Sequence, residues 1–173
     1  MDLDNKKVLI AYFSREGNNY VNGSIINLSV GNTQVAAEMI EEHTGGDLFR
    51  IEANYSYPAD YTKCTNVAKD ELRNNARPEL TETVDNMDEY DVIFLGYPNW
   101  WGTAPMAVFT FLEEYDFDGK TIVPFCTHEG SGMGHSEKDI KETCPGAEVK
   151  KGLAIHGGSV NIAENAIVNW IEK

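Results

Sequence analysis

Cysteine is scarce in this chain, and the three that are present, Cys64, Cys126 and Cys144, lie far apart. An odd number without any Cys-x-x-Cys pair argues against a disulfide framework and favours a reducing, cytoplasmic environment. No apolar run approaches the roughly 20 residues that span a bilayer. The polar N-terminus also lacks the basic-then-apolar layout of a signal peptide. The sequence therefore predicts a cytoplasmic protein with no membrane partner.

Basic residues are also few, since 14 lysines and arginines face 28 acidic residues and the net charge is −14. A field of this sign repels phosphate backbones, so we expect no nucleic-acid ligand. The charge fits simple solubility and docking of basic partners equally well. His43, His135 and His156 lack metal-ligand spacing, so no metal site is expected.

What the chain does contain is a regular alternation of apolar strand candidates and amphipathic helix candidates. Its 173 residues, 42% of them hydrophobic, suit a single domain over residues 1–173. Strands are expected at residues 8–13, 47–51, 92–96, 120–126 and 148–155. Helices are expected at residues 34–43, 61–74, 104–115 and 137–143, with a last one that sets Ala163, Ile167, Trp170 and Ile171 on one face.

This alternation predicts an α/β fold, a five-stranded parallel doubly wound sheet of order 2-1-3-4-5 with helices on both faces. In such sheets ligands bind beyond the carboxyl ends of the strands, at the point where the strand order reverses. We therefore expect functional residues in the loops after the first, third and fourth strands.

The loop after the first strand carries the residues of a phosphate site. Ser14 and Arg15 follow the strand directly, and Gly31-Asn32-Thr33 opens the next helix. Unpaired N–H groups at a helix start, a glycine turn and hydroxyl donors together suit a phosphate. An ordinary helix cap would use the same residue types.

A second candidate, Gly17-Asn18-Asn19, occurs earlier in the same loop. We favour Gly31-Asn32-Thr33, because only this copy has a helix N-terminus beside it. Residues 19–30 would then form an inserted loop. Its segment 25–30 is too apolar for a free tip, so it should pack on the protein or on a partner subunit.

The loop after the third strand places two adjacent indoles outside a buried strand. It contains Pro98, Asn99, Trp100, Trp101 and Gly102. Paired tryptophans there are typical of a platform for a flat aromatic ligand, although both could instead pack over the end of the sheet. The order of residues does not tell which indole stacks on a ligand and which braces the loop.

The loop after the fourth strand is rich in glycine, which lets backbone approach a ligand closely. The candidate binding residues are Thr127, His128, Glu129, Gly130, Ser131 and Gly132. His128 and Glu129 could equally be polar loop residues without chemistry. Tyr55, Tyr57 and Tyr61 could rim the same site, but packing is the simpler expectation for them.

Taken together, the three loops resemble those of the flavodoxin family. The phosphate loop of that family often ends in Gly-Asn-Thr, and Tyr-Pro-x-Trp-Trp-Gly at residues 97–102 is similar to the flavin-contacting loop of one branch. The resemblance implies one FMN, held non-covalently, that cycles between oxidised, semiquinone and hydroquinone states. Many flavodoxins place a tyrosine in the loop after the fourth strand, over the second flavin face, and this chain has none there.

The resemblance favours an electron carrier between redox partner proteins, acting as a monomer or a homodimer. In that role no side chain need act as acid, base or nucleophile, since the cofactor performs the redox chemistry. The alternative is an FMN-dependent NAD(P)H oxidoreductase of the quinone-reductase type. That alternative gains support from the missing tyrosine, because hydride transfer needs an open ring face.

Overall fold

A parallel sheet forms the centre of the computed structural model, which describes residues 1–173. Its strands are β1 (Val8–Tyr12), β4 (Asp47–Arg50), β5 (Val92–Pro98), β6 (Thr121–His128), β7 (Glu148–Val149) and β8 (Leu153–His156). They lie in the order β4-β1-β5-β6-β7, and β8 also pairs with β6. All these pairings are parallel; Val8 of β1, for example, lies opposite Val92 of β5.

The central strands form because their apolar runs are buried from both sides. Every residue of β1 is buried, and alternate side chains enter different cores. Leu9 and Ala11 belong to one hydrophobic cluster, and Val8 and Ile10 to the other. A continuous run of this kind suits a strand that is covered on both faces.

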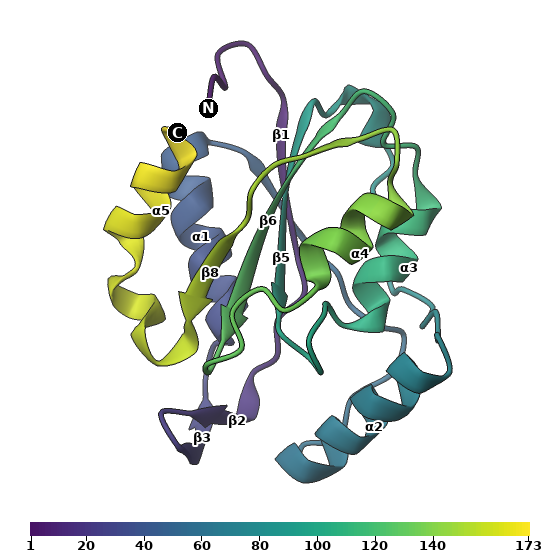
Figure 1. Cartoon of the computed structure of the whole chain (residues 1–173), viewed down its shortest axis with the longest axis vertical. Coiled ribbons are helices and arrows are strands. Elements are labelled where there is room, and N and C mark those ends of the chain that lie inside the picture. Colours follow the sequence, from purple (N-terminus) through teal and green to yellow (C-terminus); the bar gives the residue numbers. More distant parts are fainter.

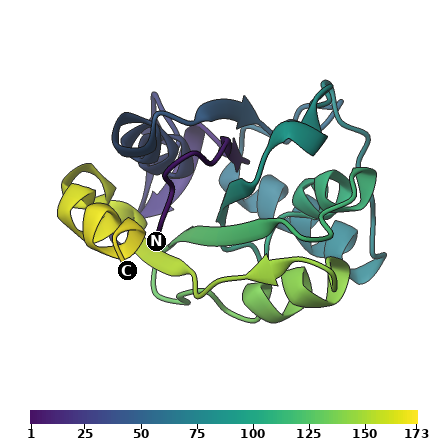
Figure 2. The same cartoon turned by 90° about the horizontal axis from the view of Figure 1, so that it is seen from above.

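Helices cover both faces of the sheet (Figures 1 and 2). α1 (Asn32–Thr44) and α5 (Glu164–Ile171) lie on one face, while α3 (Met106–Glu114) and α4 (Ser136–Thr143) lie on the other. Two short 3-10 helices, Met87–Glu89 and Gly157–Ile162, complete the set of elements. The predicted α/β fold with a mainly parallel sheet is therefore confirmed. No helix combines the length and the apolar character needed to cross a bilayer.

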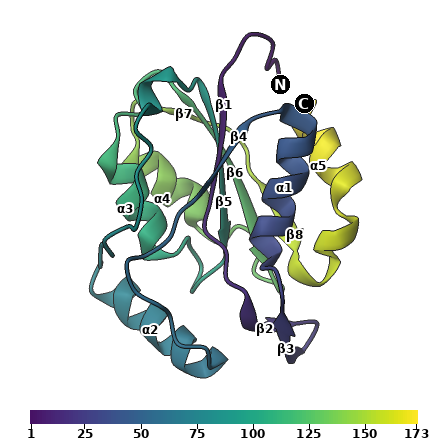
Figure 3. The ribbon, with the colours of Figure 1, turned by 180° about the vertical axis from the view of Figure 1, so that it is seen from behind.

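Two elements lie beyond the carboxyl ends of the strands (Figures 1 and 3). One is an antiparallel hairpin of β2 (Gly17–Val21) and β3 (Ser24–Leu28). The other is α2 (Tyr61–Arg73), which extends past the sheet instead of covering one of its faces. The expected inserted loop is therefore an ordered hairpin. Its turn, Asn22-Gly23, has positive φ at both residues, as a tight two-residue hairpin turn requires.

The expected count of five strands is wrong, because the segment predicted as one strand over residues 148–155 is divided into β7 and β8. Ile122 of β6 accepts a hydrogen bond from the Lys150 N–H, so its backbone faces the divided strand. Backbone direction alternates along a strand, so Pro124 faces the same way. Proline has no N–H to donate, and the pairing is interrupted between Ile122 and Phe125.

Candidate functional site

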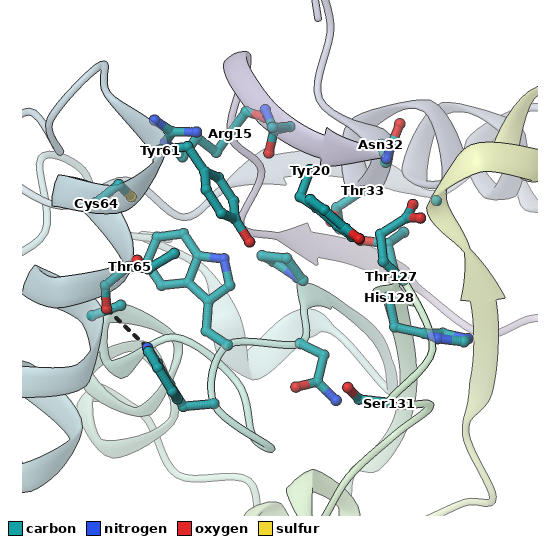
Figure 4. Close-up of a pocket in the computed structure, with 18 of the residues that line it drawn as sticks. Arg15, Tyr20, Asn32, Thr33, Tyr61, Cys64, Thr65, Thr127, His128 and Ser131 are labelled. Carbon is teal, nitrogen blue, oxygen red and sulfur yellow. Dashed lines mark hydrogen bonds between the residues drawn. The ribbon is translucent and has the colours of Figure 1, made fainter. Parts of the chain in front are cut away.

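A cavity of about 570 Å³ opens where the three predicted loops meet at the carboxyl edge of the sheet (Figure 4). Twelve of the predicted site residues line it: Arg15, Asn32, Thr33, Pro98, Asn99, Trp100, Trp101, Gly102, Thr127, His128, Glu129 and Ser131. Four others, Ser14, Gly31, Gly130 and Gly132, lie outside its lining. Loops after β1, β5 and β6 therefore share one cavity.

The start of α1 forms one end of this cavity. The first N–H groups of a helix have no intrahelical partner. Here the Gln34 N–H donates to Ser14 Oγ at 3.1 Å, and the Val35 N–H donates to the Gly31 carbonyl at 3.2 Å. The N–H groups of Asn32 and Thr33 are left for a ligand. These open N–H groups suit an anion. Arg15 is the one lysine or arginine that lines the cavity, and its guanidinium lies on the side of α2, where it donates to the carbonyls of Pro58 and Ala59 (Figure 4).

Ser14 has a different role from the expected ligand contact. Its side chain is buried and serves as the cap of α1. Gly31 lies directly against it, since a Cβ at Gly31 would come within 2.2 Å of Ser14 Oγ and 2.7 Å of the Arg15 carbonyl oxygen. Both residues shape the helix start from behind and do not line the cavity. A buried hydroxyl just after a strand cannot be told from a ligand contact by sequence alone.

The two indoles of the loop after β5 are held differently. Trp100 is half-buried and packs edge-to-face against Phe13 and Tyr57, with ring centroids 5.1 Å apart in both pairs. Trp101 is 49% exposed and has a left-handed backbone with φ of 56°. Its Nε1–H donates to the Thr65 carbonyl of α2 at 2.9 Å, the dashed line in Figure 4. Trp100 therefore belongs partly to the core, and Trp101 ties the loop to α2.

The loop after β6 joins the other two loops through polar contacts. The hydroxyls of Thr33 and Thr127 are hydrogen-bonded at 2.7 Å in a buried position. Asn99 donates from Nδ2 to the Gly132 carbonyl at 2.9 Å. Gly130 donates its N–H to His128 Nδ1 at 2.9 Å. Gly130 and Gly132 thus support the loop without lining the cavity.

His128 is the one cavity residue of this loop whose pKa is shifted. Burial lowers its pKa, and the neighbouring His156 lowers it further. The bond that Nδ1 accepts from Gly130 also requires that nitrogen to be unprotonated. His128 is therefore a neutral imidazole at neutral pH and adds no charge to the cavity.

Seven further residues line the cavity: Asn19, Tyr20, Tyr61, Cys64, Thr65, Ala68 and Gly157. Asn19 belongs to the second phosphate candidate and Tyr61 was considered as a rim residue, so sequence reasoning missed the other five. Tyr20 of the hairpin and Tyr61 of α2 stack with ring centroids 6.2 Å apart, side by side in Figure 4. Of the two roles considered for Tyr61, the structure supports rimming the cavity over the preferred packing role, because α2 lies at the carboxyl edge. The Asn22-Gly23 dipeptide between short strand-like runs was the available signal for the hairpin.

Segment 25–30 is largely exposed, so the expectation that it packs on the protein is wrong, and the alternative of packing on a partner subunit stays a prediction. Ile25, Ile26 and Val30 are 49%, 41% and 38% exposed. The hairpin meets the body of the protein at other points, one of which is its turn. The Asn22 N–H donates to Glu129 Oε2 at 2.9 Å, and the Asn22 side chain lies so close to Gly158 that a Cβ there would come within 2.1 Å of Oδ1.

A buried carboxyl anchors α2 behind the cavity wall. Glu71 is 9% exposed, and the Tyr57 hydroxyl donates to it at 3.0 Å from Oε2. Burial raises the pKa of Glu71 from its ordinary 4.5 to about 7. Tyr57 also contacts Trp100, so this anchor connects α2 to the indole loop.

The sequence and the fold of this chain are similar to those of known proteins. A family model described as flavodoxin matches residues 7–173. Curated proteins gave no match. The chain is similar to proposed flavoproteins from Bacteroides eggerthii DSM 20697 (33% identity, 96% of each chain, TM-score 0.78) and Bacteroides uniformis ATCC 8492 (30% identity, 97% and 99%, TM-score 0.77). A flavoprotein from Lactobacillus acidophilus NCFM, solved in complex with FMN, shares the fold (23% identity, 91% and 97%, TM-score 0.65).

The packing of the two indoles leads to a stability prediction. Trp100→Ala should lower the free energy of unfolding by about 2–3 kcal/mol, because it removes a ring packed against the core. Trp101→Ala, the matched control at a half-exposed position, should cost no more than about 1 kcal/mol. Urea unfolding of the ligand-free protein measures both. Equal losses would contradict the division of roles between the two indoles.

The buried carboxyl leads to a pH prediction. Between about pH 4.5 and 7 the folded state binds more protons at Glu71 than the unfolded state, so stability falls as pH rises. The loss approaches about 3 kcal/mol, at about 1.4 kcal/mol per pKa unit. Glu71→Gln should remove it, so the variant gains stability over wild type at pH 8 but not at pH 4. Urea unfolding at several pH values checks this; parallel pH profiles would contradict it.

Proposed function

Since the chain belongs to the flavodoxin family, we propose that it holds one FMN non-covalently in this cavity and uses it to move electrons. One observation carries the proposal: a single cavity joins an open helix N-terminus to a pair of indoles. FMN is a phosphate and a planar ring joined by a hydroxylated chain, and its parts match the two ends. The volume of about 570 Å³ lies within the usual range for cofactor sites.

The phosphate end of the proposed site is supported by donors and by close packing. Asn32 and Thr33 offer N–H groups at the start of α1, and Arg15 supplies the positive charge. The Arg15 guanidinium donates to backbone carbonyls at Pro58 and Ala59 and pairs with no carboxylate. Its charge is therefore not neutralised by a side chain. Gly31 keeps this end compact, because no Cβ fits against Ser14.

The ring end is supported by aromatic side chains from three separate elements. Trp100 and Trp101 come from the loop after β5, Tyr61 from α2 and Tyr20 from the hairpin. Stacked or edge-on aromatic pairs contribute about 0.5–1.5 kcal/mol beyond the burial of area. The FMN ring would gain this from a rigid frame, because Trp100 is held by the core and Trp101 by Thr65.

When bound, FMN supplies the redox chemistry, and the protein binds, orients and shields it. Asn32, Thr33 and Arg15 hold the phosphate, and the indoles orient the ring. His128 remains neutral and so adds no charge beside the cofactor. No cavity side chain needs to move a proton in this scheme.

The aromatic side chains that line the cavity favour an electron carrier. The alternative is an NAD(P)H-dependent oxidoreductase. Tyr20 and Tyr61 line the cavity in addition to the indoles, which restricts access of a nicotinamide to a bound ring. We further propose redox partner proteins with basic docking faces, in keeping with the net charge of −14. A homodimer would cover the exposed Ile25 and Ile26, and a monomer would leave them free.

The proposed function is tested by the visible spectrum of the purified protein during anaerobic reduction. We expect flavin absorbance bands and reduction in two separate one-electron steps in a potentiometric titration. NADH and NADPH should bleach the bands slowly or not at all. Rapid bleaching by either nucleotide would support the oxidoreductase instead, and failure to retain or rebind any flavin would refute the cofactor assignment.

The phosphate assignment is tested by comparing FMN with riboflavin, which lacks the phosphate. In the double variant Asn32→Ala/Thr33→Ala, the FMN dissociation constant should rise at least about tenfold, because charge-assisted hydrogen bonds are lost. Riboflavin should bind almost as it does to wild type. Flavin fluorescence titrations of the apoprotein give both constants. An equal rise of the FMN and riboflavin dissociation constants would refute the phosphate assignment.

A further inference from the structure

The outer side of β3 is a strand edge without a partner. β2 and β3 pair only with each other, in a two-stranded sheet separate from the central one. Backbone N–H and C=O groups alternate in direction along a strand, so those of every second residue of β3 point away from β2. No residue of β3 makes a hydrogen bond outside the hairpin. The edge therefore offers donors and acceptors that the single chain does not use.

The contacts that hold the hairpin lie on β2 and on the turn. Tyr20 of β2 stacks on Tyr61, and the Asn19 side chain of β2 donates to a backbone carbonyl of the body. The turn is held through the Asn22 N–H. None of these contacts involves β3, and the first four of its five residues are exposed. β3 is therefore the free side of the hairpin.

This edge lacks the features that usually prevent strand edges from pairing. Protected edges are short, charged or interrupted by proline. Two outer strands of the central sheet fit this rule, since β4 has four residues that include Asp47 and Arg50, and β7 has two residues that include Glu148. β3 has five residues with no charge and no proline. It also exposes Ile25 and Ile26, by 49% and 41%.

The distribution of charge indicates which partner suits this edge. Residues 17–37 carry no charged side chain, although the whole chain has 28 acidic and 14 basic residues. A basic partner would bind a surface that carries carboxylates, and the hairpin offers none. A second copy of this chain has the same net charge of −14, so two copies approach closely only where neither presents carboxylates. The uncharged outer strand meets this condition.

We propose that two copies of this chain associate through β3, with the two free edges paired antiparallel across a twofold axis. A self-complementary contact of this kind closes after two copies, so it forms a dimer and not a fibre. The pairing uses all five residues of the strand only when the axis passes through Ile26, the middle residue. Ile26 then lies opposite the same residue of the second copy, and Ser24 lies opposite Leu28.

The dimer stabilises the hairpin wall of the cavity. A two-stranded hairpin is marginally stable in water, and pairing of the two edges turns it into a four-stranded sheet. Tyr20 lines the cavity and lies directly opposite Ile25 of β3, so the pairing also holds Tyr20 in place. This consequence rests on the proposed function. FMN and the second copy should strengthen each other's binding by the same factor.

Disulfide cross-linking tests the contact and its register. The three native cysteines are buried, so an introduced cysteine supplies the accessible thiol. Opposed residues of antiparallel strands have Cα atoms about 4.5–5.5 Å apart, which is within disulfide range. Oxidation by copper phenanthroline should therefore convert most of the Ile26→Cys apoprotein to a disulfide-linked dimer.

Ser24→Cys is the matched control on the same strand. It should form little cross-linked dimer, because the two copies of this position lie about 14 Å apart at about 3.4 Å per residue. Equal yields for Ser24→Cys and Ile26→Cys, or no cross-link with Ile26→Cys, would overturn the proposed pairing.

Sedimentation of the apoprotein tests the association without any cysteine. Wild type should shift from monomer to dimer between about 1 and 500 µM, because a five-residue edge is at the weak end of protein interfaces. Ile26→Lys places two cations opposite each other and should stay a monomer. Leu48→Lys, at a 36% exposed position of the charged strand β4, should dimerise as wild type does. A wild-type monomer at every concentration, or loss of the dimer in both variants, would overturn the inference.

Sedimentation with FMN tests the link to the cavity. Saturating FMN should lower the dissociation constant of the wild-type dimer at least about fivefold, the low end for coupled sites. An unchanged constant would contradict the coupling and leave the dimer intact. Failure of FMN to bind would refute the proposed function, whereas the cross-linking of Ile26→Cys would still establish the dimer.

Discussion

The buried hydrogen bond between the hydroxyls of Thr33 and Thr127 joins two segments that are 94 residues apart in sequence. It ties the first turn of α1 to the end of β6, while β5 lies between β1 and β6 in the sheet. The indole loop that follows β5 is consequently held between the helix start and the glycine-rich loop. This contact, together with the pairing of β1 with β5 and of β5 with β6, holds the anion end and the aromatic end of the cavity in a common frame.

The electrostatics of the cavity differ from those of the whole protein. The chain has a net charge of −14, yet the open N–H groups at the start of α1 make one end of the cavity favourable to an anion. The one unsatisfied buried oxygen, on Glu129, lies beside that end.

The hairpin gives this fold an additional wall. Its turn is held by Glu129 and Gly158, its base by the Asn19 side chain, which donates to the Arg15 carbonyl at 3.0 Å, and its middle by the stacking of Tyr20 on Tyr61. The loop after β6 carries no aromatic residue between Thr127 and Ser136. The aromatic cover of the cavity therefore comes from the indole loop after β5, from the hairpin inserted in the loop after β1, and from α2.

Local signals in the sequence were enough to establish the α/β alternation, the loops that carry the site and most residues of its wall. Buried parallel strands read as continuous apolar runs, and the choice of Gly31-Asn32-Thr33 over Gly17-Asn18-Asn19 followed from helical periodicity. Tertiary structure alone decided the rest. Ser14 became a cap because Gly31 packs against it, Tyr61 reached the cavity because α2 lies past the sheet edge, and the last strand divided opposite Pro124. Each of these depends on which segment lies beside another, and local pattern carries no information about such neighbours.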